Sequence, residues 1–363
     1  MNSKSKDVIF LLGAGASAEA EIPISGEMIA RIENLMATRP NWKPFLGLYH
    51  HVKSAIYYSA GLRGEFNQRV NFNIEVLANT LYELARNEEH PIYPFVGSWN
   101  GRFSALAGEN FKQVEVFRQM ILDQLKDWVQ PENMKKADYY KGFRVLQQAM
   151  GFPLKVFSLN YDLCFERVVA DDTYRVETGF GGYGDDHPWE WRRFEEPQVE
   201  VDRPEVYLYK LHGSINWKRN AAGNLVAVDH AGSNIPALEM QVIFGREFKL
   251  EAGDPYLFYA FEFRRSTLDA RAIVSMGYGF GDDHINKMLV QALRHDTNKR
   301  LVVIANVKDE KEAAERAVTV AKKLGVSEKG VKVMAGSAKT FLQRKDLDKV
   351  IQEFLPEPPK AEF

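Results

Sequence analysis

Short, mainly apolar runs recur along this chain, and each is followed at once by glycine or by small polar residues. Asp7–Leu12, Leu154–Leu159, Ala272–Met276 and Leu301–Ala305 are of this kind. Such runs of about four to eight residues are typical of strands buried on both faces, as in parallel sheets. Stretches with helical apolar spacing lie between them. Strands that alternate with helices predict an α/β fold, a Rossmann-like, doubly wound, mostly parallel sheet.

The helical patterns divide the chain into parts. Residues 41–150 are mainly helical, and Asn73 is a plausible N-cap for one of their helices. We therefore expect a core from residues 1–40 and 151–350, a helical insertion over residues 41–150, and a proline- and charge-containing tail over residues 351–363 that is disordered from Glu357 onward. Further strands are expected at Tyr207–Leu211, Gln241–Phe244 and Val331–Met334, and helices at Gly26–Thr38, Ile74–Ala85, Phe111–Val129, Ile285–Leu293 and Glu310–Lys323.

Composition argues against several classes of protein. A net charge of −2 provides no global basic field for direct nucleic-acid binding. The single cysteine, Cys164, rules out a disulfide framework and a zinc site built from several thiolates, and it suits a reducing cytoplasm. The run Val8–Leu12 is shorter than the roughly 7–15 apolar residues of a signal peptide. No stretch approaches the roughly 18 apolar residues of a membrane span, so we expect a cytoplasmic protein.

Two strand ends near the start of the predicted core carry segments that suit a dinucleotide. Gly13–Ser17 (GAGAS) follows the first strand, where glycines let the backbone approach a pyrophosphate, although Ala18 departs from Gly-x-Gly-x-x-Gly. A tight turn is the alternative. Ser158–Asp162 (SLNYD) follows the second strand, at the edge where ligands bind in open α/β sheets, and a helix cap is the alternative there. Ile22–Gly26 is either a cofactor-covering loop or a plain loop.

Later strand ends repeat this arrangement. His212 stands in Leu211–Ser214 (LHGS) and is either a reactive or a structural, hydrogen-bonded histidine. Gly277–Asn286 (GYGFGDDHIN) follows a strand and opens a helix. Its glycines suit close backbone approach to a ligand, and an aspartate there could cap the helix, so a plain capped turn is the alternative. Asn306 could meet a ribose hydroxyl or be an ordinary loop residue.

Four of these segments, in their order along the chain, resemble the sirtuin-like family, and most of all its bacterial branch of phage-defence NAD⁺ hydrolases. They are Gly13–Ser17, Ser158–Asp162, Leu211–Ser214 and Gly277–Asn286. Gly13–Ser17 matches the family's Gly-Ala-Gly-x-Ser. Asn160 and Asp162 match the Asn-x-Asp motif that contacts the nicotinamide ribose, and His212 matches the catalytic histidine. Gly277–Asn286 is similar to the Gly-Tyr-x-Phe-x-Asp stretch of the bacterial branch.

The resemblance implies cleavage of NAD⁺ to nicotinamide and ADP-ribose without a metal. Asn160 would orient the ribose and a water, and His212 would be a general base or a ribose-hydroxyl partner. Asp162 would position Asn160 or the ribose, or hold the loop. Deacylating sirtuins carry a four-cysteine zinc module, which one cysteine cannot build, so water is favoured as the acceptor. A cyclised ADP-ribose stays open as a product. The residues expected to bind NAD are Gly13, Ala14, Gly15, Ser17, Pro23, Asp162, Gly277, Tyr278 and Asn306.

Other functions stay open: a sensor of NAD⁺ or ADP-ribose without turnover, a deacylase or ADP-ribosyl transferase, and an unrelated α/β enzyme. A free NAD⁺ hydrolase would drain its own cell, so its activity has to be restrained. The sequence contains no second motif-bearing domain, so we expect restraint from assembly. The expectation is a homo-oligomer that uses residues 41–150 as a contact surface, unless these only cover the sheet, with a HerA-like ring ATPase as the partner that the resemblance implies.

Overall fold

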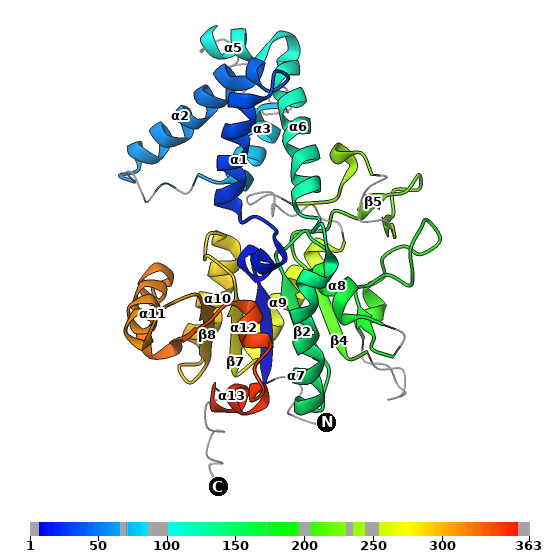
Figure 1. Cartoon of the computed structure of the whole chain (residues 1–363), viewed down its shortest axis with the longest axis vertical. Helices are drawn as coiled ribbons and strands as arrows, with labels where there is room; N and C mark the ends of the chain where they lie inside the picture. The colour runs from blue at the N-terminus through cyan, green and yellow to red at the C-terminus, as the bar shows by residue number, and fades with distance from the viewer. Residues whose placement is uncertain are drawn as a thin grey trace.

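A computed structural model describes residues 7–65, 70, 72–85, 101–171, 173–195, 204–229, 235–243 and 254–354. At its centre is a seven-stranded sheet in the order β3-β4-β2-β1-β7-β8-β9, in which all neighbouring strands are parallel (Figure 1). The predicted doubly wound α/β fold is therefore confirmed. The strands are β1 (Val8–Leu12), β2 (Leu154–Ser158), β3 (Val176–Glu177), β4 (Val206–Lys210), β7 (Ala272–Met276), β8 (Arg300–Ala305) and β9 (Val331–Ala335).

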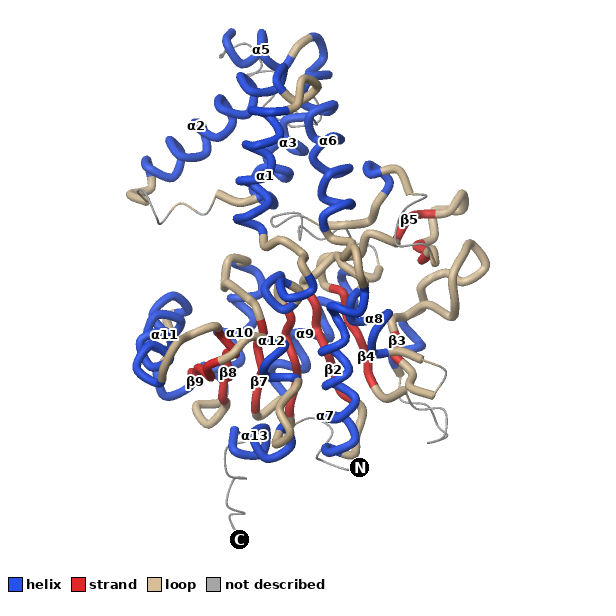
Figure 2. The backbone as a smooth tube through the Cα atoms, viewed as in Figure 1, coloured by secondary structure: helices blue, strands red, loops and turns tan. Residues whose placement is uncertain are grey.

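Helices bury both faces of the sheet, as the continuous apolar runs predicted (Figure 2). In β1, Phe10 and Leu12 face one helical layer, whereas Ile9 and Leu11 face the other. Phe10 packs edge-on against Phe143 with ring centroids 5.2 Å apart. The first layer holds α7 (Gly142–Met150), α8 (Cys164–Val169), α12 (Ala338–Leu342) and α13 (Leu347–Phe354), and the second holds α9 (Tyr256–Asp269), α10 (Asp283–His295) and α11 (Glu310–Leu324).

Five further helices form a separate layer beyond the carboxyl ends of the strands, and we call them the helical module (Figure 1). They are α1 (Ser25–Thr38), α2 (Leu46–Leu62), α3 (Ile74–Ala85), α5 (Gly101–Ala107) and α6 (Lys112–Trp128). Helix α3 contacts α1, α2 and α6. The predicted cap is present, because Asn73 Oδ1 accepts a hydrogen bond from the Val76 amide at 2.9 Å. Within the described part of the chain, no helix has both the length and the apolar character to cross a membrane.

The module does not coincide with the expected insertion. Helix α1, which the sequence placed in the core, lies with the module, whereas the 3₁₀ segment η8 (Met134–Lys141) and α7 lie against the sheet. The reason is that an amphipathic pattern shows which face of a helix is buried, but it does not identify the element that covers that face. The division of the chain into a core and an insertion stays a proposal. In it, α1 now belongs to the insertion, and η8 and α7 belong to the core.

The expected strand Gln241–Phe244 is wrong over the residues that the structure describes. Val242 forms a single isolated bridge with Gly213, and the Ile243 amide donates to the His212 carbonyl at 2.8 Å. This segment therefore pairs with the turn after β4 and not with a strand. A single bridge to a turn does not make the repeated hydrogen bonds of a β-ladder. Phe244 lies outside the described residues, as does the predicted tail from Glu357 to Phe363. A two-stranded antiparallel pair, β5 (Trp217–Arg219) and β6 (Leu225–Ala227), was not anticipated.

Candidate functional site

The turns that follow β1 and β7 are locked together through their backbones. The Gly13 amide donates to the Met276 carbonyl and the Gly15 amide to the Gly277 carbonyl, both at 2.9 Å. A Cβ on Gly13 would lie 2.6 Å from the Tyr278 Cα, and Gly277 has φ +66° with no room for a side chain. The glycines are thus required for contact between the two turns, at the point where strand order reverses around β1.

Asn160 lies directly beyond β2 and is held by the glycine loop. Its Nδ2 donates to Ser17 Oγ at 3.1 Å, and its backbone amide donates to Ser158 Oγ at 3.1 Å. Ser17 Oγ in turn shares a hydrogen bond of 2.9 Å with the Tyr140 hydroxyl from η8. Asn160 is 7% exposed, and its Oδ1 is buried without a hydrogen-bond partner among the described residues. An amide oxygen in that state is available to a ligand that enters the site.

Asp162 and Lys210 fix the loop that carries Asn160. Asp162 Oδ1 accepts from the Cys164 amide at 2.9 Å, which caps the start of α8. The buried Lys210 ammonium donates to the Asp162 carbonyl, to Glu166 Oε1 at 2.7 Å and to Ser214 Oγ at 3.0 Å. Lys210 therefore joins the turn after β2 to the turn after β4. The sequence did not single it out, because a lysine at the end of an apolar strand normally indicates an exposed terminus.

His212, in the turn after β4, is bonded to a residue from the other half of the sheet. Its Nε2 lies 3.0 Å from Asp282 Oδ2, and both side chains are buried. Strands β4 and β7 lie on opposite sides of β2 and β1, so this bond crosses the ends of the central strands. The other oxygen of Asp282 caps α10 by accepting from the His284 and Ile285 amides at 2.8 and 3.1 Å. The sequence predicted the cap and missed the histidine contact.

The electrostatics of this pair favour a charged imidazole. Burial lowers the pKa of His212, but the hydrogen bond and charge of Asp282, with the charge of Glu75, more than offset it, so the pKa is raised. For Asp282, burial raises the pKa of the carboxyl, but the hydrogen bond and charge of His212 and the two α10 amides outweigh it, so that pKa is lowered. The pair therefore stabilises the positive charge that the ring carries when it is protonated.

One tyrosine lies beside His212 and another beside its partner Asp282. The Tyr161 ring stacks beside His212 with centroids 6.2 Å apart, and its hydroxyl donates to the Ile243 carbonyl at 2.9 Å. The Tyr278 hydroxyl lies 3.1 Å from the Asp282 carbonyl oxygen and 2.9 Å from Asn286 Oδ1, and its single proton can be donated to either. All of these side chains except Asn286 are less than 10% exposed. These side chains are therefore largely shielded from solvent in this structure.

The structure brings most of the predicted site residues to one edge of the sheet. Ala14 begins a 3₁₀ turn of the glycine loop, and Pro23 is buried just before α1. Asn306 follows β8, two strands away from β1, and is exposed, so it lies outside the cluster. No three His, Cys, Asp or Glu side chains group as a metal site among the described residues, and independence from metal stays a prediction.

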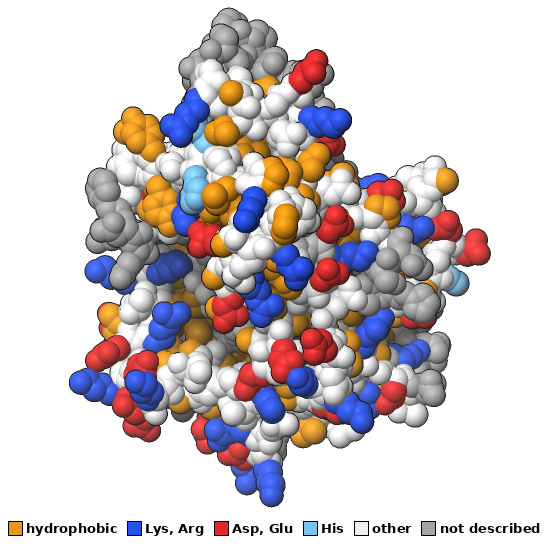
Figure 3. Space-filling view, turned by 45° about the horizontal axis from the view of Figure 1, so that its top comes forward, with side chains coloured by type: hydrophobic (Ala, Val, Ile, Leu, Met, Phe, Trp, Pro, Cys, Tyr) orange, Lys and Arg blue, Asp and Glu red, His pale blue; other side chains and the backbone are white. Residues whose placement is uncertain are grey.

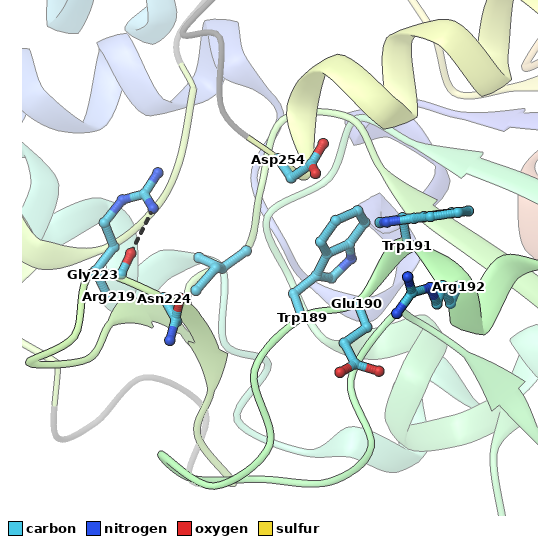
Figure 4. A pocket seen from close by; sticks show the side chains of 9 residues that line it. Trp189, Glu190, Trp191, Arg192, Arg219, Gly223, Asn224 and Asp254 are labelled. Atoms are coloured by element: carbon cyan, nitrogen blue, oxygen red, sulfur yellow. Dashed lines mark hydrogen bonds between the residues drawn. The ribbon is translucent and has the colours of Figure 1, made fainter.

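A cavity of about 390 Å³ lies elsewhere, between the loop after β3 and the β5–β6 pair (Figure 4). The indole of Trp189 turns inward and donates to the Tyr259 hydroxyl at 2.8 Å, so it belongs to the core of the second layer. None of the residues predicted to bind NAD lines this cavity. Its lining is Trp189, Glu190, Trp191, Arg192, Arg219, Gly223, Asn224, Leu225 and Asp254.

Comparisons with known proteins bear on this site. Residues 154–327, just under half of the chain, match the family model of the SIR2-like domain. The predicted resemblance is thus supported as a similarity to the SIR2-like domain over that range, which holds Asn160, His212 and Gly277. A search of curated proteins found no match.

Several solved structures are similar to this chain. A Sir2 homologue in complex with NAD has 12% identity, a TM-score of 0.45, and coverage of 97% of this chain and 91% of that one. A triple mutant of a Sir2 homologue in complex with 2′-O-acetyl ADP ribose has 14% identity, a TM-score of 0.45, and coverage of 97% and 94%. A singly substituted Sir2 homologue with ADP ribose has 12% identity, a TM-score of 0.43, and coverage of 97% and 94%.

Proposed function

We propose that this protein is an NAD⁺ glycohydrolase that cleaves NAD⁺ to nicotinamide and ADP-ribose. The observation that supports it most is the convergence at one sheet edge of Asn160, held by the glycine loop through Ser17, and His212, held by Asp282. The SIR2-like domain over residues 154–327 supports the same reaction class, as do the NAD and ADP-ribose ligands of the Sir2 homologues.

In the proposed reaction the bond between nicotinamide nitrogen and ribose C1′ breaks, and its electron pair leaves with neutral nicotinamide. An oxocarbenium-like centre develops at C1′, and a water oxygen bonds to it while the water loses one proton. The Asn160 Oδ1, which lies buried beside Ser17, would accept from that water or from a ribose hydroxyl. Asp282 engages His212 Nε2, so the other ring nitrogen, Nδ1, would accept the proton.

The remaining predicted NAD contacts follow from the same arrangement. Gly13, Gly15 and Ser17 would meet the pyrophosphate, with Gly277 and Tyr278 toward the adenosine half. Asp162 would act indirectly, because its carboxylate caps α8 and its carbonyl is held by Lys210. Asn306 would reach a ribose only if the bound dinucleotide extends across β7 to β8. Water is the proposed acceptor, because one cysteine cannot form a four-cysteine zinc module.

The decisive experiment incubates purified protein with NAD⁺ and measures nicotinamide and ADP-ribose by liquid chromatography. We expect Asn160→Ala and His212→Ala each to lower the rate by about 10²–10⁴-fold, the usual loss for one positioned acid–base group. Circular dichroism should show that both variants stay folded. Near-normal turnover in either folded variant would refute its catalytic assignment. Binding of NAD⁺ without nicotinamide release would instead support a sensor, and deacylation of an acetylated peptide would support a deacylase.

We further propose that the protein acts in the cytoplasm in bacterial anti-phage defence by depleting NAD⁺, and that assembly controls it. The exposed apolar side chains of α2 support a contact surface: Leu46 is 41% exposed, Tyr58 is 70% and Leu62 is 71%. Figure 3 shows apolar side chains gathered over the helical module, with charges of both signs interspersed below it. The proposed assembly is a homo-oligomer that docks a HerA-like ring ATPase.

Light scattering, run alongside the NAD⁺ assay with and without a co-encoded ATPase, tests this control. We expect an oligomer whose activity changes with the partner, and Leu62→Glu should weaken the assembly. A monomer that is fully active alone and harmless on expression would refute control by assembly.

A further inference from the structure

Two consecutive tyrosines of η8 bring their hydroxyl groups to two consecutive residues of the glycine loop. The Tyr139 hydroxyl donates to the Ala16 carbonyl at 2.6 Å, and the Tyr140 hydroxyl shares a hydrogen bond of 2.9 Å with Ser17 Oγ. The partners of each bond are 123 residues apart in the sequence. The sequence alone placed both tyrosines in the helical insertion, and no step of the proposed reaction uses them.

Packing holds the second of these tyrosines in place. Tyr140 is 1% exposed, stacks on Tyr139 with ring centroids 4.7 Å apart, and meets Phe165 of α8 edge-on at 5.8 Å. The side chain of Asn133 caps the start of η8 by accepting from the Lys135 amide at 3.0 Å. The segment also packs against α8 and α12. The Tyr140 hydroxyl therefore has a fixed position relative to the sheet.

The direction of each hydrogen bond in this network follows from the number of protons available. A carbonyl oxygen can only accept, so Tyr139 uses its single hydroxyl proton on Ala16. Tyr139 can then only accept from Tyr140, which is stacked on it and shares a side-chain hydrogen bond with it. Tyr140 has no second proton, so Ser17 Oγ donates to it. Ser17 can then only accept from Asn160, which faces it with Nδ2 at 3.1 Å.

We propose that Tyr140 is a positioning residue, which acts through Ser17 to hold the Asn160 amide in the one orientation that leaves Oδ1 for a ligand. This inference rests on the proposed NAD⁺ cleavage, in which Asn160 Oδ1 accepts from the attacking water or from a ribose hydroxyl. Oδ1 is buried and has no hydrogen-bond partner among the described residues, so it is the free end of the network. An amide turned by 180° would present Nδ2 there, and a donor would bond the water through the lone pair that has to attack C1′.

Removing the Tyr140 hydroxyl would release this constraint without removing any group that meets NAD⁺. In Tyr140→Phe the ring keeps its packing, and Ser17 loses the acceptor for its proton. Ser17 can then donate to Asn160 Oδ1, so both orientations of the amide have a partner at Ser17. The share of molecules with Oδ1 directed at the ligand should therefore fall.

The test compares Tyr140→Phe, Ser17→Ala and the double variant with wild type, with Tyr174→Phe as a matched control. Tyr174 is buried in the same layer, and its hydroxyl donates to the Phe143 carbonyl at 3.5 Å, outside this network. Two readouts are needed. One is kcat and KM for NAD⁺. The other is the exchange of the Asn160 side-chain amide protons with water, followed by NMR in the ligand-free protein labelled with ¹⁵N-asparagine and assigned by their loss in Asn160→Ala.

Tyr140→Phe should lower kcat by about 10–100-fold, the usual cost of misplacing a reacting group. KM should change by less than about threefold, because the groups that bind NAD⁺ stay in place. Exchange of the Asn160 amide should become about 2–10-fold faster, which is the effect of losing one hydrogen bond. In the Ser17→Ala background, adding Tyr140→Phe should change kcat by less than about twofold, since Tyr140 acts through Ser17. Tyr174→Phe should match wild type.

Three results would overturn the inference. The first is unchanged exchange of the Asn160 amide in Tyr140→Phe, with or without lost activity. The second is a double variant in which the rate losses of Tyr140→Phe and Ser17→Ala multiply, because the two residues would then act independently. The third is an equal loss in Tyr174→Phe, which would make the effect common to any buried tyrosine hydroxyl of this layer. If wild type releases no nicotinamide, the proposed function fails, and the amide exchange still decides the role of Tyr140.

Discussion

Replacing Lys210 with methionine should show how strongly the two strand-end turns depend on one buried ion pair. Lys210 is 2% exposed and donates to Glu166, Ser214 and the Asp162 carbonyl. Breaking a fully buried pair by removing one partner costs about 3–5 kcal/mol. The Glu166 side chain keeps 18% of its surface, so water offsets part of the loss. We expect the free energy of unfolding to fall by about 2–3 kcal/mol.

The assay is urea denaturation followed by tryptophan fluorescence, with the NAD⁺ cleavage rate measured below the transition. The turn that holds Asn160 would shift, so kcat should fall by up to about 10²-fold, the usual cost of misplacing a reacting group by about 1 Å. Adding Glu166→Gln should restore part of the stability, because no charge is then left unpaired. The control is Lys218→Met, whose exposed pair with Asp185 spans 3.8 Å and should be worth less than about 1 kcal/mol. A Lys210→Met variant as stable as wild type would refute the reasoning.

Three further predictions concern the same edge of the sheet. Asp282→Asn should keep the α10 cap but move the His212 pKa downward, since burial then acts with less opposition; NMR titration checks the direction, and an unchanged pKa would contradict it. In wild type, the contribution of the His212–Asp282 pair to the free energy of unfolding should be lost as pH rises through the raised pKa of His212. Denaturation of Asp282→Asn at a series of pH values should not show this loss. Gly277→Ala should destabilise by more than about 2 kcal/mol, because φ is +66° and its Cβ would meet the Ala16 backbone; Gly279→Ala, whose Cβ meets no described atom within 4 Å, should cost less than about 0.5 kcal/mol. A chelator should leave NAD⁺ cleavage unchanged, because one cysteine and scattered histidines offer no evident zinc cage; loss of activity that a divalent ion restores would refute this.

The strand ends could be predicted because they are properties of local sequence. Apolar runs as long as a buried strand predicted β1, β2, β4, β7, β8 and β9 to within one residue at each end. In a parallel sheet all carboxyl ends meet at one edge, so the polar residues that follow the runs had to gather there. Asn160 and His212 were expected at this edge for that reason, and the structure places both of them there.

Contacts between distant segments could not be predicted. The sequence offered an aspartate of this segment only as a helix cap, and one carboxylate oxygen of Asp282 does cap α10. Only the tertiary structure shows that the other oxygen reaches His212, 70 residues away. Lys210 carries no local pattern that separates it from a surface charge.

The sequence by itself therefore determined the parallel sheet and the edge on which the candidate site lies. Each strand can be recognised from its own residues, and parallel strands all end at the same edge. Only the tertiary structure decided which carboxylate pairs with His212 and which two turns Lys210 joins. The physical reason is that a buried charge is stable only beside a partner, and the partner is supplied by whichever element packs there, at a distance along the chain that no local pattern records.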